Sequence, residues 1–252
     1  MERNTCATLV RAGVQLVGVV WCARRGVAAR ARFLQRWAAR HGAFHTVGQI
    51  LGRVYDRARN GRHDRRVLAG LVDEAADRAT LRGADLVSIE TDSYSRPDTL
   101  AAIQRLDPDI FVVHTKYIVG AKVRALAPVA VIGGHPGITP WYRGAYSPFW
   151  ALLHGRADLV GCSVFLIDDG IDTGPVLFQE QLPMVPGEDS HLTIAWKGIQ
   201  RQSALQAEAI LRLDAGECLR LRRLSDIPAD SYFTLPTLTD LLRYRRRQRL
   251  VR

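Results

Sequence analysis

The sequence predicts an α/β fold built on an open, mostly parallel sheet. Three short runs rich in Val, Ile and Leu, at residues 13–22, 84–91 and 109–115, alternate with longer segments that have helical spacing. This alternation indicates parallel strands joined by crossover helices. A chain of 252 residues with 47% hydrophobic residues can bury such a core, either as one large domain or as one domain with an appendage.

The predicted elements can be followed along the chain. Residues 2–12 have the spacing of a helix that leads into the first strand, although an open α/β domain normally begins with a strand. A first strand is therefore apparently absent. The helices expected between and after the strands cover residues 28–42, 67–83, 97–106 and 147–155. The remaining strands are expected at residues 128–134, 161–168 and 174–184, and the last two form a hairpin around the turn DGIDT.

Two helices are predicted in the carboxyl-terminal part, a long amphipathic one over residues 191–217 and a last one from about residue 236. We therefore expect an α/β domain over residues 1–188, followed by a helical extension over residues 189–252.

Composition limits the possible partners. The net charge is +10, but only three of the 35 basic residues are lysine, and the charge gathers in the last helix as LLRYRRRQRLVR. That segment is typical of a solvated or partner-facing helix, and contact with an anionic partner is the alternative. A nucleic-acid partner is disfavoured. No apolar run of about 18 residues or signal peptide is present, so we expect a cytoplasmic protein with no membrane partner.

Several enzyme classes are excluded by missing motifs. The four cysteines are too widely spaced for a zinc knuckle or a CxxC pair, and we expect free thiols. No GxGxxG follows a strand, which excludes a dinucleotide-binding dehydrogenase, and the seven histidines never form HExxH. We expect no metal site.

A histidine follows the predicted strand at 128–134. In open parallel sheets, binding and catalytic sites form just beyond the carboxyl ends of the strands. This residue, His135, stands in VIGGHPGITPWYRG, and His114 follows the neighbouring strand. Glycines around His135 allow close approach of a ligand to the backbone, while Pro136 and Pro140 stiffen the loop. A lone histidine at a strand end is more often a structural hydrogen-bonding residue, so the position by itself only suggests a site.

A longer pattern surrounds this histidine. HPGITPWYRGAYSPFWALLHG, followed by GCSVFLIDDGIDTGPVLFQ, resembles the signature of the folate-dependent formyltransferase family, and the similarity covers roughly residues 84–185. The resemblance implies a Rossmann-like fold and transfer of a formyl group from 10-formyltetrahydrofolate to an amine by an Asn, His and Asp trio. The His maps to His135 and the Asp to Asp172. The implied cofactor contacts are mostly backbone and come from Tyr117, Ile118, Val119, Ile167, Asp168, Asp169, Gly170 and Ile171.

The pattern departs from the family at one position. The Asn of the trio is replaced by Gly133, which has no side chain to donate a hydrogen bond to the developing oxyanion. Three explanations of this replacement are open. A nearby group such as His114, Thr115, Lys116 or a water substitutes for the Asn. Alternatively, the protein is a folate-binding or regulatory relative, or it catalyses a different reaction, as a formyltetrahydrofolate hydrolase does. Asp-Thr-Gly is also good turn chemistry, so a structural role for Asp172 stays open.

The acceptor is expected to be a small-molecule or carrier-bound amine. Initiator tRNA is disfavoured because the tail is short for a tRNA-binding domain of the family's type. A homo-oligomer is possible through the sheet edge at residues 13–22 or through the tail helix, since an uncovered strand edge tends to pair with another chain. Arg143 and Gly144 are interpreted as structural rather than catalytic.

Overall fold

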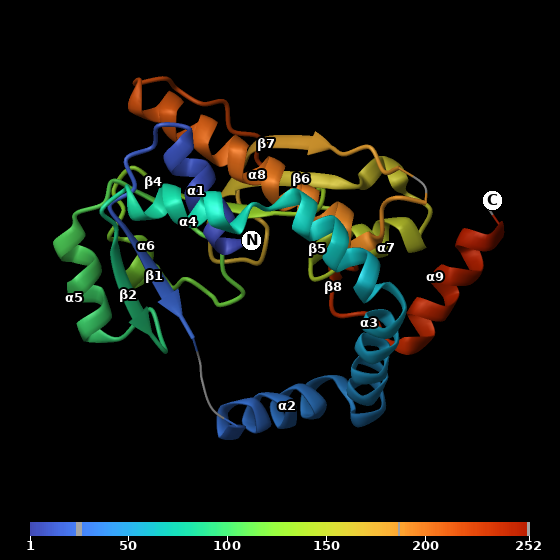
Figure 1. Ribbon diagram of the computed structural model, residues 1–252. Coiled ribbons are helices and arrows are strands. Elements are labelled where there is room, and N and C mark those ends of the chain that lie inside the picture. Colours follow the sequence, from blue (N-terminus) through green and yellow to red (C-terminus); the bar gives the residue numbers. More distant parts are fainter. Residues whose placement is uncertain (24–26, 186, 251–252) are drawn as a thin grey trace.

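The computed structural model describes residues 1–23, 27–185 and 187–250, and in that part the chain forms an open α/β structure with the predicted elements (Figure 1). The predicted fold class is therefore confirmed. Strand β1 (Gly18–Cys22) pairs in parallel with β2 (Val87–Thr91) as a two-stranded sheet. A separate sheet has the strand order β3-β4-β6-β7. A third sheet pairs the short strands β5 (Arg143–Gly144) and β8 (Tyr232–Phe233). The division of the strands into separate sheets was not predicted from the sequence.

The four-stranded sheet is mixed. Strand β3 (Ile110–Val112) runs parallel to β4 (Ala130–His135). Strand β6 (Gly161–Leu166) pairs antiparallel with β4 and with β7 (Val176–Gln181), so the predicted hairpin is confirmed. The register places Gly133 opposite Phe165 and His135 opposite Ser163.

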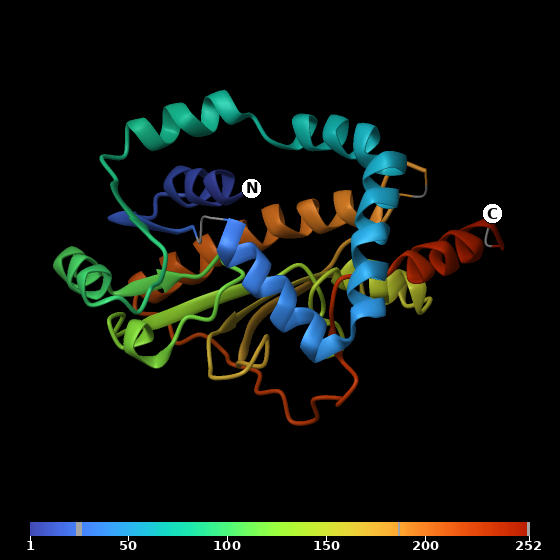
Figure 2. The same cartoon turned by 90° about the horizontal axis from the view of Figure 1, so that it is seen from below.

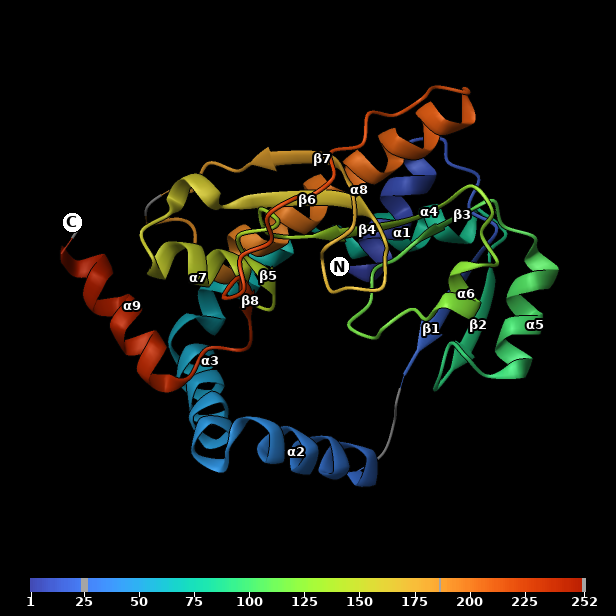
Figure 3. The same cartoon turned by 180° about the vertical axis from the view of Figure 1, so that it is seen from behind.

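One helical layer covers one side of the molecule. Helix α1 (Glu2–Arg11) packs against α4 (Glu74–Arg82) and α8 (His191–Asp214), as Figure 2 shows. Helix α2 (Val27–His41) and the long α3 (Ala43–Leu71) extend away from the sheets, and α3 returns to contact α9 (Leu238–Leu250), as Figure 3 also shows.

The predicted helix at 67–83 is divided in two. Helix α3 ends at Leu71, and Asp73 begins a new helix because its carboxylate accepts hydrogen bonds from the backbone N–H groups of Ala75 and Ala76. Residues 43–66, to which the sequence analysis assigned no element, belong to α3. The shorter elements are α5 (Pro97–Leu106), α6 (Ala121–Arg124), α7 (Ser147–Leu153), the 3₁₀ turn η1 (Ala157–Leu159), β5 (Arg143–Gly144) and β8 (Tyr232–Phe233).

The core lies between the four-stranded sheet and α8. Ile132 and Val164 from the sheet pack with Leu205 and Ala209 of α8, and all four are buried. Helix α8 begins after Ser190, whose side chain accepts from the N–H of Thr193 in a reciprocal capping box. The division into domains at residue 188 stays a prediction, and α8, beyond it, packs directly on the sheet.

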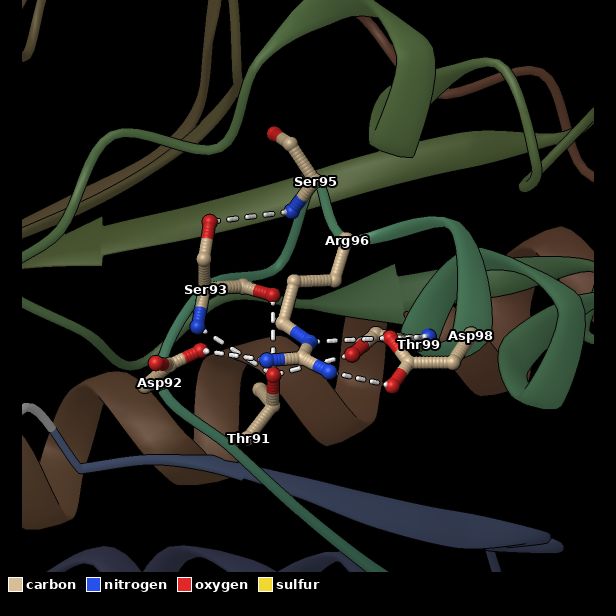
Figure 4. A network of polar contacts seen from close by, with 7 residues as sticks. All are labelled: Thr91, Asp92, Ser93, Ser95, Arg96, Asp98 and Thr99. Atoms are coloured by element: carbon tan, nitrogen blue, oxygen red, sulfur yellow. Dashed lines mark hydrogen bonds and ion pairs between the residues drawn. The ribbon is translucent and has the colours of Figure 1, made fainter.

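A polar corner joins β2 to α5 (Figure 4). Arg96 donates two hydrogen bonds to the carboxylate of Asp98, and this pairing lowers the pKa of Asp98 to about 2. Thr91, the last residue of β2, donates to the carbonyl of Ser93 and lies 2.9 Å from the hydroxyl of Thr99 in α5. These contacts fix the turn from which α5 crosses over to β3.

Candidate active site

His135 is the last residue of β4 and is 5% exposed. Its Nε2 lies 2.8 Å from the carbonyl oxygen of Tyr142 and 2.6 Å from Oγ of Ser147. A carbonyl can only accept, so Nε2 carries the hydrogen and donates it. In the neutral ring the lone pair is then on Nδ1, on the opposite side of the imidazole.

Asp172 stands on that opposite side. Its Oδ2 lies 3.5 Å from Nδ1 of His135 and accepts a hydrogen bond of 2.9 Å from the backbone N–H of Gly144. The residue adopts a left-handed conformation, with φ of 54°, in the loop between β6 and β7. A proton taken up by Nδ1 would therefore face a negatively charged carboxylate.

Arg143 and Gly144 hold the loop that carries Asp172. Arg143 donates from Nε to Oγ of Ser231, over 2.9 Å, and from Nη1 to the carbonyl of Ile171, over 3.1 Å. Both contacts are made to protein groups, in keeping with the structural role expected for this pair. The loop is thus tied to β5 by one side chain and by one backbone donor.

Gly144→Ala is expected to destabilise the fold by about 1–3 kcal/mol, because φ here is +86° and the added Cβ would clash with the carbonyl oxygen of Phe233. Urea unfolding measures this change. The matched control is Gly216→Ala, since Gly216 has φ of +77° but has nothing within 4 Å of an added Cβ. Equal losses in the two variants would contradict a tight contact at Gly144.

All the predicted site residues except Asp169 line the same cavity. A cavity of about 2360 Å³ is lined by His135, Asp172, Tyr117, Ile118, Val119, Ile167, Asp168, Gly170 and Ile171. Asp169 is not among the lining residues, and its carboxylate instead pairs with Arg124. Asp168 accepts hydrogen bonds from the N–H of Gly170 and from the hydroxyl of Thr173, which folds the loop back on itself. The roles of these residues in binding a cofactor stay predictions.

Three groups that could replace the missing amide border the same cavity. His114, Thr115 and Lys116 follow β3 and all line it. Burial lowers the pKa of His114, which favours its neutral form. The hydroxyl of Thr115 accepts from Tyr94 and from the N–H of Tyr117, and among the described residues its own hydrogen has no acceptor.

The space beside Gly133 is filled. A Cβ built on Gly133 would clash with Cδ1 of Ile167 and would lie 3.0 Å from the ring of Phe165. The Ile167 side chain therefore occupies the place that a side chain at position 133 would need. Nothing in the linear motif indicates this contact, because it depends on the register between β4 and β6.

Two further groups at the site were missed by the sequence analysis. Ser147 and the Tyr142 carbonyl both hold His135. The only signal for Ser147 is its place before Pro148 at the start of α7. A second buried hydroxyl, on Ser163, donates to the carbonyl of Gly137 over 2.7 Å and so fixes the loop after His135.

Comparisons with known proteins assign this chain to a family. A model of the formyl transferase family matches residues 48–210, well over half of the sequence. The chain belongs to the formyl transferase family. Within that family it is 35% identical over 135 residues to a methionyl-tRNA formyltransferase of Synechococcus sp. (strain JA-3-3Ab), covering 53% of this chain and 39% of the relative.

Other known proteins are also similar to this chain. A GDP-perosamine N-formyltransferase of Brucella melitensis biotype 1 is 30% identical over 112 residues, covering 44% of this chain and 42% of the relative. The chain thus matches less than half the length of these curated formyltransferases. A solved structure of glycinamide ribonucleotide transformylase 1 from Symbiobacterium toebii aligns with a TM-score of 0.49 and 22% identity, covering 71% of this chain and 90% of that one.

Proposed function

We propose that this formyl transferase family member is an N-formyltransferase that moves a formyl group from 10-formyltetrahydrofolate to an amine of a small-molecule or carrier-bound substrate. The observation that carries the proposal is the pairing of His135 with Asp172 at the end of β4, within the segment matched by the family. Curated relatives that act on an aminoacylated tRNA and on a sugar nucleotide support an amine acceptor.

The cavity has room for a reduced folate together with a second substrate. Small-ligand sites usually occupy about 300–1,000 Å³, and this cavity is larger, at about 2360 Å³. Ile118, at its border, is 81% exposed and offers an apolar contact. When bound, 10-formyltetrahydrofolate would supply the formyl group. Tyr117–Val119 and the loop at 167–171 would hold it, chiefly through backbone groups.

His135 and Asp172 have the arrangement needed to receive a proton from an attacking amine. Nε2 is held by the carbonyl of Tyr142, so Nδ1 is the free basic position, and Asp172 would stabilise the imidazolium that forms there. A donor to the developing oxyanion is also required. Gly133 cannot provide one through a side chain, and we assign that role to a group on the loop at 114–116.

Titration with 5-formyltetrahydrofolate, a stable analogue, tests the binding part of the proposal. Saturable binding is expected below millimolar concentration. Asp168→Asn should weaken it, because Asp168 folds the loop through Gly170 and Thr173. Asp169→Asn is the matched control, since Asp169 lies outside the cavity lining. The affinity of this variant for 5-formyltetrahydrofolate should be the same as that of the unaltered protein. The absence of binding at millimolar folate would contradict the proposal.

The rival function is hydrolysis of the formyl folate, or folate binding without transfer. The observation that favours it is the loss of a side-chain donor at Gly133, with Ile167 filling the space. Free formate as the product would identify the hydrolase.

The cytoplasmic location and self-association stay predictions from the sequence. No helix in the described ranges has both the length and the apolar character needed to cross a bilayer.

A further inference from the structure

Helix α3 is inverted relative to an ordinary surface helix, which packs its apolar stripe on the core and turns its polar side chains to water. Phe44 and Val54, in its first half, are 98% and 62% exposed. None of the buried residues of α3 has a large apolar side chain, and they are Thr46, Gln49, Gly52, Asp56, Gly61 and Asp64. The first half of α3 therefore faces the protein with its polar side and solvent with its apolar side.

The polar side of α3 is docked to the protein by specific contacts. The side chain of Gln49 donates to the carbonyl of Leu235 over 2.7 Å, and Asp64 accepts a hydrogen bond from Ser190 over 2.7 Å. Asp56 lies 3.3 Å from Nε2 of the histidine that follows Ser190. These contacts fix the rotation of the helix about its axis. The apolar side cannot turn inward unless they break.

The exposed face of α3 is apolar over its first half and basic over its second. With about 3.6 residues per turn, positions 44, 47, 51, 54, 58, 62 and 65 lie along one side of a helix. These positions are all exposed, and they hold Phe44, Val47, Leu51, Val54, Ala58, Arg62 and Arg65. Single exposed apolar residues are ordinary, whereas a continuous group of them marks an interaction site.

The exposed charge of α3 is entirely positive. Its only two carboxylates, on Asp56 and Asp64, are buried. Its six arginines are all exposed, at positions 53, 57, 59, 62, 65 and 66. Across the described ranges, none of the six forms an ion pair with a carboxylate. A row of apolar side chains that continues into uncompensated arginines matches a partner that is both apolar and negatively charged.

These two features discriminate among anionic partners. A nucleic acid would contact the arginines through its phosphates but would leave the apolar row in water. A second copy of the chain would bring six more arginines toward the same face, and like charges repel. The surface of a bilayer with anionic lipids satisfies both features, because Phe and Leu side chains enter the boundary of the acyl chains while arginines contact the headgroups.

We propose that α3 binds the surface of an anionic membrane, with its apolar row in the interface and Arg62 and Arg65 on the phosphates of the headgroups. The sequence analysis excluded a membrane partner because no apolar run could span a bilayer, and a helix that lies on the surface needs no such run. The residues that line the cavity include none from α3. The inference therefore goes beyond the proposed function and requires neither folate nor amine.

Cosedimentation of the full chain with large vesicles tests the proposal. Vesicles of phosphatidylcholine alone are compared with vesicles that contain about 30% phosphatidylserine, an anionic lipid. We expect at least about tenfold stronger binding to the anionic vesicles, because each arginine near the surface adds to the attraction. Binding should weaken when salt is raised from about 0.05 to about 0.5 M, since ions screen these charges. Equal binding to the two kinds of vesicle, or none, would overturn the proposal.

The apolar row is tested by Phe44→Ser combined with Val54→Ser. This variant should bind the anionic vesicles at least about tenfold more weakly, because binding scales with the apolar area that enters the interface. The matched control, Val87→Ser with Leu221→Ser, removes two exposed apolar side chains from β2 and from the segment after α8. It should bind as the unaltered protein does. Equal weakening in the two variants would contradict a specific role for α3.

The basic half is tested by Arg62→Gln combined with Arg65→Gln, which should weaken vesicle binding by about ten- to thirtyfold. The matched control is Arg220→Gln with Arg223→Gln, which removes the same charge from two exposed residues after α8. Equal losses would show that binding follows net charge alone and would overturn the assignment to α3. Circular dichroism and urea unfolding should show that all these variants are folded.

The other partners are outcomes of the same experiment. Tighter binding to a duplex RNA or to poly-glutamate than to the anionic vesicles, unaffected by the change at Phe44 and Val54, would overturn the lipid and indicate a nucleic acid or an acidic protein. A lipid-free dimer that Phe44→Ser dissociates would indicate a second copy of the chain. In the supporting outcome, the fluorescence of Phe44→Trp shifts to shorter wavelength with anionic vesicles only. Folate titration of the same variants is read separately, so failure of the proposed function leaves this test intact.

Discussion

His135→Ala is expected to reduce formyl transfer by about 10²–10⁴-fold, the usual contribution of a positioned proton-transfer group. The reason is the geometry of the ring, whose Nε2 is committed to Tyr142 and Ser147 while Nδ1 faces Asp172 at 3.5 Å. Asp172→Asn should also lose transfer, because the amide cannot stabilise the imidazolium. The rate of formylated amine formation measures both effects.

His63→Ala is the control for these variants. His63 lies on α3 and bonds the carbonyl of Glu188, outside the cavity lining, so its replacement should leave the rate unchanged. Circular dichroism and urea unfolding should show that all three variants are folded. An unchanged rate in His135→Ala would end the proposed mechanism.

The second large effect is expected from restoring the missing amide. An Asn at position 133 would share a strand face with His135, two residues away, and could donate to the developing oxyanion. The single variant Gly133→Asn should lose stability without a gain in rate, because its Cβ would clash with Ile167. Combining it with Ile167→Ala removes the clash with Ile167, and the ring of Phe165, 3.0 Å from the added Cβ, then has to shift only slightly. The combined variant should then raise the rate by up to about a hundredfold, roughly 2.7 kcal/mol of barrier.

Ile167→Ala alone completes the comparison as a double-mutant cycle. The predicted folate contact of residue 167 is through its backbone. The bond from its N–H to the carbonyl of Val131 holds that backbone in place, so the alanine variant should bind folate normally. A combined variant no faster than Ile167→Ala would show that another group already supplies the oxyanion contact, or that the reaction is not acyl transfer to an amine.

Local patterns predicted most of the elements. Helix α5 begins and ends where its spacing indicated, with Pro97 at the first turn, and the hairpin of β6 and β7 forms around the predicted turn. The break at Asp73 was missed because apolar spacing continues across it, and only the capping contacts reveal the new helix. The division of the described strands into three sheets depends on which strand edges meet, which no local pattern encodes.

The candidate site, like the fold, was predicted only in part from the sequence. His135 and Asp172 were found because they stand in a long linear motif. Ser147 was missed, and so was the contact of Ile167 with Gly133, because both arise only when α7 and the end of β6 fold against β4. Asp169 belongs to the motif but pairs with Arg124 away from the cavity lining, since neighbouring residues of a tight turn point in different directions.

The most direct measurement incubates the purified chain with 10-formyltetrahydrofolate and a panel of amines that includes amino sugar nucleotides, amino acids and carrier-bound amines. Mass spectrometry quantifies formylated amine and free formate in the same reaction. The proposed function predicts that one class of amine is formylated in excess of the formate released, and that His135→Ala abolishes this product. Formate as the sole product with every amine, at a rate that His135→Ala leaves unchanged, would contradict it.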